Sequence, residues 1–174
     1  MNSKAKLIAD KFKMMPHPEG GYFKEMYKSD EKILSGHLPE RYGDERKFST
    51  AIYFMLADNQ FSALHRIKSD ELWHFYSGSS LTIYVIDEKG NLSLIKLGVD
   101  FEKGDVPQAI VKRNYWFGAH VNEKNSYSFV GCTVAPGFHF DDFEMGDRKN
   151  LLKLFPQHEE VIIKLTDQWL IVNR

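Results

Sequence analysis

The residues with the clearest chemical potential lie in the stretch FSALHRIKSDELWHFYSG, at positions 61–78. Apolar and polar residues alternate on both sides of a polar turn at 68–70, which predicts two consecutive β-strands. Every second side chain of a strand shares a face. His65 belongs to the alternating set of the first strand, and Glu71 opens the set of the second strand. If both sets point inward, the imidazole and the carboxylate converge on one pocket.

An imidazole beside a carboxyl group is a candidate acid–base pair. Histidine titrates near neutral pH, and a neighbouring carboxylate can orient its ring. His65 and Glu71 are therefore candidate catalytic residues. A second reading of the same two residues stays open: they form a satisfied, buried hydrogen-bonded pair without turnover.

The rest of the chain predicts an all-β core with a few flanking helices. Short β-rich runs separated by turn residues are typical of a sandwich or barrel. Helical spacing of apolar residues predicts an N-terminal helix at about 3–15, ended by Pro16, and C-terminal helices at about 147–167. The predicted barrel occupies about 20–144, with runs at 48–56, 61–67, 71–76, 81–86, 92–97, 108–111, 115–121, 126–134 and 138–144.

Two segments before the central strands are predicted to be irregular. The segment 17–23, HPEGGYF, contains a proline and paired glycines, which break regular structure. It either leads tightly into an edge strand or covers the mouth of a pocket. The polar segment 30–47 is predicted to be an exposed excursion without a core of its own. Histidines in turns or at helix ends are expected to be exposed, namely His17, His37 and His158.

The composition excludes several classes of protein. The 174 residues carry 23 basic and 24 acidic side chains, so the net charge of −1 gives no footprint for nucleic acid or for an anionic membrane surface. No apolar run of membrane-spanning length and no secretory signal appears. The single Cys132 excludes an internal disulfide and a thiolate cluster. We expect a cytoplasmic protein with neither nucleic-acid nor membrane partners.

The spacing around the two candidate residues resembles the first signature of the cupin superfamily, G-x5-H-x-H-x3,4-E-x6-G. His65, Glu71 and Gly78 keep their places in it, whereas Ile67 replaces the second histidine and Asn59 the opening glycine. Five blocks in order further resemble the cupin-five group (DUF985), from His17 to the last helix. These blocks are HPEGGYF, STAIYFML, SDELWHFYSG, WFGA and VAPGFHFDDFE.

This resemblance implies a single cupin domain over residues 1–174, folded as a double-stranded β-helix or jelly-roll barrel. It also implies a homodimer formed by sheet packing and strand exchange. His74 and Tyr76, which alternation places on the outward face of a central strand, fit such an interface. Cupins include dioxygenases, isomerases, storage proteins and sugar-binding regulators, so the fold alone does not select an activity.

The resemblance also locates the metal-ligand positions of cupins. Aligning the second signature on the WFGA block places Phe117 at the histidine, so Ile67 and Phe117 occupy two of the four ligand positions. His65 and Glu71 alone supply fewer protein ligands than a catalytic metal usually has. His120 is a further histidine near that block, but it is expected to point to the opposite face. We expect no cofactor, or at most a weakly held divalent ion on His65 and Glu71.

Three functions remain open at this point: a metal-independent isomerase or epimerase for a small carbonyl or sugar-like compound, a non-catalytic small-molecule binding protein, and a metal-dependent oxygenase or isomerase with a reduced ligand set. The metal-free deoxysugar-nucleotide epimerases among cupins pair a barrel histidine with a tyrosine. Tyr53 and Tyr84 are the candidates for that tyrosine. Candidate ligand contacts are Ser49, Trp73, His74, Trp116 and Phe138, with His74 facing either the pocket or a partner subunit.

Overall fold

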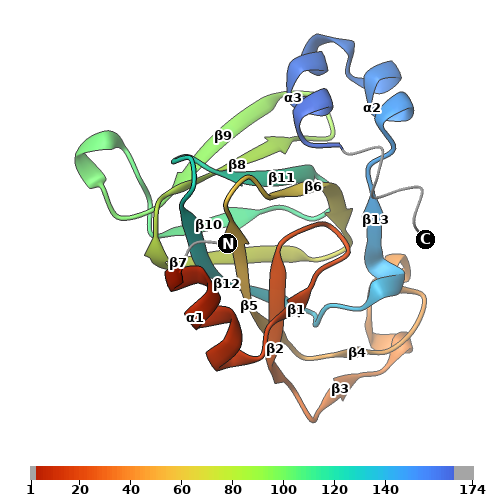
Figure 1. The fold of residues 1–174 in the computed structure, drawn as a ribbon. Coiled ribbons are helices and arrows are strands. Elements are labelled where there is room, and N and C mark those ends of the chain that lie inside the picture. Colours follow the sequence, from red (N-terminus) through yellow and green to blue (C-terminus); the bar gives the residue numbers. More distant parts are fainter. Residues whose placement is uncertain (1–2, 167–174) are drawn as a thin grey trace.

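The computed structural model describes residues 3–166 and shows two antiparallel β-sheets packed face to face, with helices outside them (Figure 1). The larger sheet has the order β1-β2-β5-β12-β7-β10. Its strands are β1 (Met15–Pro16), β2 (Tyr22–Lys28), β5 (Thr50–Ala57), β12 (Tyr127–Ala135), β7 (Asp70–Gly78) and β10 (Gln108–Val111).

The smaller sheet has the order β13-β6-β11-β8-β9. Its strands are β13 (Phe143–Met145), β6 (Phe61–Ile67), β11 (Trp116–Val121), β8 (Leu81–Ile86) and β9 (Leu92–Leu97). The two sheets enclose the main core. Alternation along β5 illustrates how the sequence builds it, because Ile52 and Phe54 point into this core, whereas Tyr53 and Met55 pack on the outer face of the sheet.

Helices cover part of each outer face. Helix α1 (Ser3–Phe12) lies against the larger sheet, where its Ala5 is buried beside Met55 and Phe129. Helices α2 (Arg148–Leu154) and α3 (Glu159–Lys164) cover the smaller sheet, joined by the 3-10 turn η5 (Pro156–His158). Among residues 3–166, no helix combines the length and the apolar character that crossing a membrane requires.

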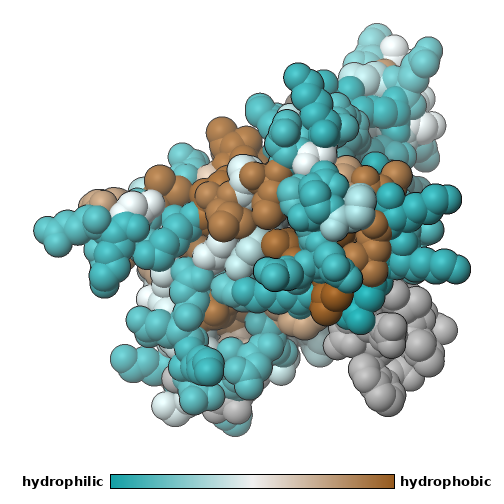
Figure 2. Space-filling view, turned by 90° about the horizontal axis from the view of Figure 1, so that it is seen from above, coloured by the Kyte–Doolittle hydropathy of each residue, from teal (hydrophilic) through white to brown (hydrophobic). Residues whose placement is uncertain are grey.

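Apolar side chains remain exposed at the end of the molecule where β9, α2 and α3 lie. Seen from above, that end shows hydrophobic residues gathered near its centre among hydrophilic ones (Figure 2). The exposed apolar residues of these elements include Leu94, Leu154 and Ile163.

Two segments differ from the sequence-based expectation. The excursion 30–47 does have buried residues. It contains the two-stranded sheet β3 (Lys32–Ile33) and β4 (Arg46–Lys47), the 3-10 turns η1 (Ser35–His37) and η2 (Glu40–Tyr42), and the buried side chains of Tyr42 and Arg46. Arg46 donates two hydrogen bonds to the buried Asp142, at 2.6 and 2.7 Å. This ion pair anchors a segment that was expected to be an exposed excursion.

The last predicted strand, at 138–144, is also shorter than expected. The 3-10 turn η4 (Phe140–Asp142) interrupts the segment. Of the predicted strand, only the part that falls within β13 is paired, and its partner is β6. The N-terminal helix ends at Phe12, because Lys13 has a φ of 51° and the chain then enters β1. The third helix ends at Lys164, and the predicted end at residue 167 lies outside the described residues.

Candidate functional site

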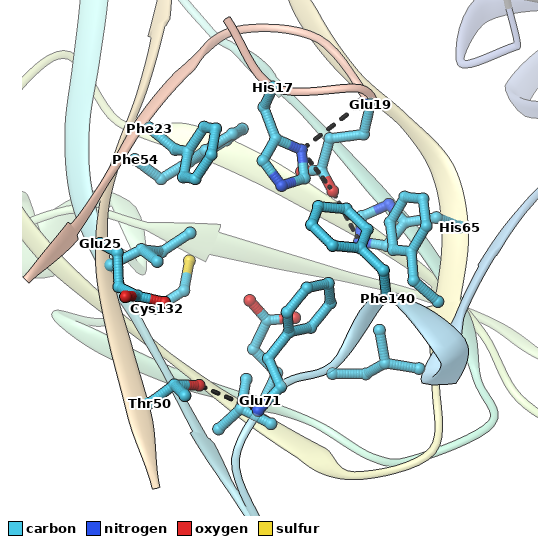
Figure 3. Close-up of a pocket in the computed structure, with 15 residues that line it drawn as sticks. His17, Glu19, Phe23, Glu25, Thr50, Phe54, His65, Glu71, Cys132 and Phe140 are labelled. Carbon is cyan, nitrogen blue, oxygen red and sulfur yellow. Dashed lines mark hydrogen bonds and ion pairs between the residues drawn. The ribbon is translucent and has the colours of Figure 1, made fainter. Parts of the chain in front are cut away.

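A cavity of about 90 Å³ lies between the two sheets (Figure 3). Its wall comes from the N-terminal loop, from β2, β5, β6, β7, β12 and β13, and from the segment around η4. The lining residues are His17, Glu19, Phe23, Glu25, Thr50, Ile52, Phe54, His65, Ile67, Glu71, Cys132, Val134, Phe138, Phe140 and Phe143. Most of this wall is apolar, so its five buried titratable side chains stand out: two imidazoles, two carboxyl groups and the thiol of Cys132.

His65 and Glu71 both line this cavity, where strand alternation predicts them. His65 comes from β6 and Glu71 from the first residues of β7, and their side chains are buried. The turn between the two strands places one residue in each sheet, so the imidazole and the carboxyl group occupy different walls. Figure 3 shows the cavity between them.

The N-terminal loop supplies the other half of the polar site. His17 and Glu19 are each only 8% exposed at the side chain, although we expected His17 to be exposed. The loop is held against β6 because the backbone N–H of Ala63 donates to the carbonyl of Glu19 at 2.8 Å. Gly20 has a φ of 110°, and a Cβ there would lie 2.2 Å from the carbonyl oxygen of Phe61. Only glycine permits this close approach.

These residues form a continuous network from one imidazole to the other. Oε2 of Glu19 lies 3.2 Å from Nε2 of His65 and 3.3 Å from Nδ1 of His17. Ser62 donates to the other carboxyl oxygen of Glu19 at 2.8 Å. Nδ1 of His65 lies 2.7 Å from the carbonyl oxygen of Ala63, so this nitrogen is the donor. Nε2 of His65 is then the acceptor that faces Glu19.

Burial sets the protonation states of the two groups that sequence reasoning selected. Desolvation raises the pKa of Glu71 to about 8, and the negative charge of Glu19 adds to that shift. Desolvation lowers the pKa of His65 to about 4. The apolar surroundings disfavour the charged form of each group. At neutral pH the site therefore holds a protonated carboxyl group and a neutral imidazole.

Burial also favours the neutral form of the two loop residues, Glu19 and His17. Burial raises the pKa of Glu19, and it lowers the pKa of His17. Cys132, beside Glu71, has its thiol pKa raised well above the ordinary value by burial. A thiol held in this state is a poor nucleophile. Burial thus disfavours the charged form of each of these groups.

Aromatic rings close the cavity. Phe138 and Phe140 meet edge to face with centroids 5.1 Å apart, and Phe143 lies 6.1 Å from each of them. Phe140 is 55% exposed, so it marks the side of the cavity nearest to solvent. The backbone N–H of Phe138 donates to Thr50, which fixes this aromatic wall to β5. Phe138 was an expected ligand contact, and it lines the cavity.

Neither candidate tyrosine lines the cavity, which corrects the expectation that one of them faces it. Tyr53 lies on the outer face of the larger sheet, where its ring packs against Phe12 and Tyr76. Tyr84 lies on the outer face of the smaller sheet, where its hydroxyl accepts a hydrogen bond from Lys164 at 3.0 Å. Strand parity is the reason, since both residues alternate with core residues of the same strand.

Four expected ligand contacts also lie away from the cavity wall. Trp73 points inward but is packed in the core between Phe54 and Phe117. Ser49 donates a hydrogen bond to the carbonyl of Val134. Trp116 lies outside the barrel, where the Arg66 guanidinium stacks on its ring. His74 lies on the outer face of the larger sheet, beside Thr133 and Gln108. His74 therefore faces away from the pocket.

The donors around the cavity do not suit a metal of the cupin kind. Ile67 lines the wall where a second histidine would stand, and the Phe117 ring packs 4.1 Å from the His65 ring. Nε2 of His65, the nitrogen that a metal would need, already faces Glu19. No group of three or more His, Cys, Asp or Glu side chains within residues 3–166 is arranged to hold an ion.

Comparisons with known proteins agree with this fold. The chain is 28% identical over 150 residues to the uncharacterized yeast protein YML079W of Saccharomyces cerevisiae, which covers 81% of this chain and 74% of that protein. Protein SO0799 of Shewanella oneidensis superposes with a TM-score of 0.84 at 36% identity, over 96% of this chain and 98% of that one. Oxalate decarboxylase of Bacillus subtilis shares only the fold, with a TM-score of 0.53 at 14% identity, over 87% of this chain and 36% of that one.

A family model also matches the chain directly. The model is Cupin_5, described as cupin superfamily (DUF985), and the match spans residues 6–146, which include the loop of His17, both sheets and the η4 segment. The protein is therefore a cupin, and it belongs to the Cupin_5 (DUF985) family.

Proposed function

We propose that this cupin binds a small carbonyl compound in its cavity and catalyses proton transfer next to the carbonyl group without a metal, as an isomerase or epimerase. One observation carries the proposal. A buried carboxyl group, Glu71, lies across a small apolar cavity from an imidazole–carboxyl–imidazole network formed by His17, Glu19 and His65. Such an arrangement offers a ligand one proton-transfer group on each side.

The protonation states suit enolisation. The fraction of Glu71 that is ionised is a strong carboxylate base, because its pKa is about 8. A neutral imidazole across the cavity is a suitable hydrogen-bond donor for the carbonyl oxygen, because it stabilises developing negative charge there. Environments that shift the titration of two groups in opposite directions are typical of acid–base sites.

The proposed reaction begins at the α-carbon of the ligand. The bond between the α-carbon and its hydrogen breaks, and the proton moves to the Glu71 carboxylate. The electron pair of that bond moves toward the carbonyl oxygen, which accepts a hydrogen bond from the imidazole. In an α-hydroxy carbonyl compound, return of the proton from Glu71 to the former carbonyl carbon, with the hydroxyl proton passing to the former carbonyl oxygen, gives isomerisation. Epimerisation needs a proton on the opposite face of the α-carbon. The imidazole donates the proton of one nitrogen to that carbon while its other nitrogen takes the carboxyl proton of Glu19, and the proton held by Glu71 then returns to Glu19 through solvent.

The cavity volume limits the ligand. One water molecule needs roughly 10–15 Å³ of such space, so about 90 Å³ holds a ligand of roughly six to eight non-hydrogen atoms. A nucleotide sugar could place only a small part of itself inside. We therefore propose a short-chain carbonyl compound.

A non-catalytic binding protein is the second candidate. The observation in its favour is that both nitrogens of His65 already have partners inside the protein, Ala63 and Glu19. A network satisfied in this way can exist solely to stabilise the barrel. The two candidates differ in whether a bound carbonyl compound loses its α-hydrogen.

Hydrogen exchange tests the proposal. Hydroxyacetone is incubated with the protein in D2O, and proton NMR follows the loss of its α-hydrogens. We expect at least about 100-fold acceleration over buffer, and loss of that acceleration in Glu71→Gln. His74→Gln, on the outer face of the sheet, is the matched control and should behave as the wild type. Exchange at the buffer rate in hydroxyacetone and in other short ketones would favour the binding protein.

The metal-independent part needs its own measurement. Two measurements separate metal-independent from metal-dependent proton transfer. One is elemental analysis of tag-free protein, and the other is the rate of α-hydrogen exchange before and after dialysis against a chelator. We expect unchanged exchange after chelation. One equivalent of iron, zinc or manganese that disappears in His65→Ala, together with chelator-sensitive exchange, would instead favour the metal-dependent cupin enzymes.

A further inference from the structure

We propose that His17, delivered by the N-terminal loop, is the imidazole that contacts the ligand, and that the site selects uncharged carbonyl compounds over anions. The identity of the ligand as a carbonyl compound rests on the proposed function. The assignment of His17 and the selection against anions rest on the geometry of the cavity wall.

His65 has no free nitrogen to offer. Its Nδ1 is 2.7 Å from the carbonyl oxygen of Ala63, and its Nε2 is 3.2 Å from Oε2 of Glu19. Its ring also packs against the rings of Phe117 and Phe143, with centroids at 4.1 and 5.3 Å. A ring with partners at both nitrogens and two aromatic neighbours is fixed in place and holds Glu19. His65 is therefore a positioning residue.

His17 differs because only one of its nitrogens has a partner. Nδ1 lies 3.4 Å from the backbone N–H of Glu19 and 3.3 Å from Oε2 of the same residue. Within residues 3–166, Nε2 of His17 has no hydrogen-bond partner, and in Figure 3 the ring reaches into the cavity on the side opposite Glu71. Since Nδ1 accepts the Glu19 N–H, the neutral ring carries its proton on Nε2. His17 thus presents a donor to the ligand.

The charge on the cavity wall favours an uncharged ligand. Among the described residues that line the cavity, none is a lysine or an arginine, and three are glutamates: Glu19, Glu25 and Glu71. Glu25 is exposed, so its carboxyl group belongs to a part of the wall that reaches solvent. A buried anion without a cationic partner pays a large desolvation penalty. A carbonyl oxygen needs only donors, and His17 provides one.

A matched pair of probes tests the selection. Pyruvamide and pyruvate have the same number of non-hydrogen atoms and differ in charge. Titration of each into ¹⁵N-labelled protein, followed by NMR, gives both dissociation constants. We expect pyruvamide to bind at least about tenfold more tightly than pyruvate, with shifts at His17 and Glu71. Equal or tighter binding of pyruvate, or no binding of pyruvamide, would overturn the inference.

Variants test the assignment of His17. His17→Phe removes the donor, and we expect at least about tenfold weaker binding of pyruvamide. His17→Gln keeps an N–H donor and should restore most of it, whereas His74→Gln should change nothing. The imidazole ¹⁵N shifts of the unliganded protein give a readout independent of binding, and they should place the His17 proton on Nε2. A proton on Nδ1, or binding unaffected by His17→Phe, would overturn the assignment.

These results remain separable from the proposed function. If pyruvamide binds selectively through His17 but the protein accelerates no α-hydrogen exchange in hydroxyacetone, the ligand class stands and catalysis fails. If exchange is fast but pyruvate competes as well as pyruvamide, catalysis stands and the selection fails.

Discussion

Nε2 of His65 lies 3.2 Å from Oε2 of Glu19, and this contact joins a barrel strand to the loop that precedes β2. It makes the N-terminal loop part of the cavity wall. The loop brings His17 along with Glu19, so one of the two imidazoles and one of the two buried carboxyl groups at the site depend on how closely it packs against β6. A change in the position of the N-terminal loop would therefore change the geometry of the site.

Substitution at Gly20 should break that packing. A Cβ at this position would lie 2.2 Å from the carbonyl oxygen of Phe61, and φ is 110°. We expect Gly20→Ala to reduce the free energy of unfolding by roughly 2–3 kcal/mol, measured by urea denaturation, because the loop must move away from β6.

Gly43→Ala is the matched control for backbone strain alone. Gly43 also has a positive φ, 73°, but an added Cβ there meets nothing within 4 Å. Its cost should stay near 1 kcal/mol. Equal losses in both variants would mean that the close contact with Phe61 contributes nothing.

The raised pKa of Glu71 predicts an unusual dependence of stability on pH. Its folded pKa of about 8 exceeds the unfolded value of 4.5, so the folded state keeps a proton that the unfolded state loses. Stability contributed by this group therefore falls as pH rises from 4.5 to 8. His65, with a folded pKa of about 4 against 6.5, acts oppositely, and its contribution rises with pH between those values.

The two effects oppose each other between pH 4.5 and 6.5, and only the Glu71 effect remains above 6.5. Glu71→Gln cannot ionise, so its stability relative to wild type should increase by about 2–4 kcal/mol between pH 4.5 and 8. Urea denaturation of both proteins at several pH values measures this. A difference that does not depend on pH would show that Glu71 titrates normally in the folded protein.

The sequence predicted the positions of His65 and Glu71 at one cavity because strand parity and the short turn at 68–70 are local properties. It could not predict the partners of these two residues. The contact of Glu19 with His65 spans two segments that nothing in the sequence pairs. The paired glycines after Glu19 were the available signal, since they permit a close backbone approach.

Parity also explains the incorrect expectation about the tyrosines. Tyr53 alternates with Ile52 and Phe54, which line the cavity, so it must face outward. Spacing within one strand fixes which residues share a face, but it does not say which face is inner when both are apolar. The outer faces here are apolar because helices cover them.

The buried ion pair of Arg46 and Asp142 should be essential for the excursion 30–47 and for η4. Asp142 is buried and accepts two of the hydrogen bonds that the Arg46 guanidinium donates, and the carbonyl oxygens of Glu45 and Tyr42 accept the others. Asp142→Asn would leave a buried arginine without its counter-charge, which we expect to cost about 3 kcal/mol in urea denaturation. Asp141→Asn, next to it but exposed, should cost less than about 0.5 kcal/mol. Similar losses in the two variants would contradict a structural role for the pair.

The outer face of the larger sheet is where we expect a second copy of the chain to bind. Tyr76 and Ile110 are exposed on this face, by 49% and 52%, and His74, which pairs with Gln108 across β7 and β10, lies on the same face. Exposed apolar residues grouped on one sheet face indicate an interaction surface.

Light scattering should give twice the 20.2 kDa mass of one chain, and Ile110→Lys should reduce the measured mass to that of the monomer. Leu94→Lys, equally exposed but on the other sheet, should leave the dimer intact. A monomer at micromolar concentration for the wild type, or dissociation only in Leu94→Lys, would show that the larger sheet is not the interface.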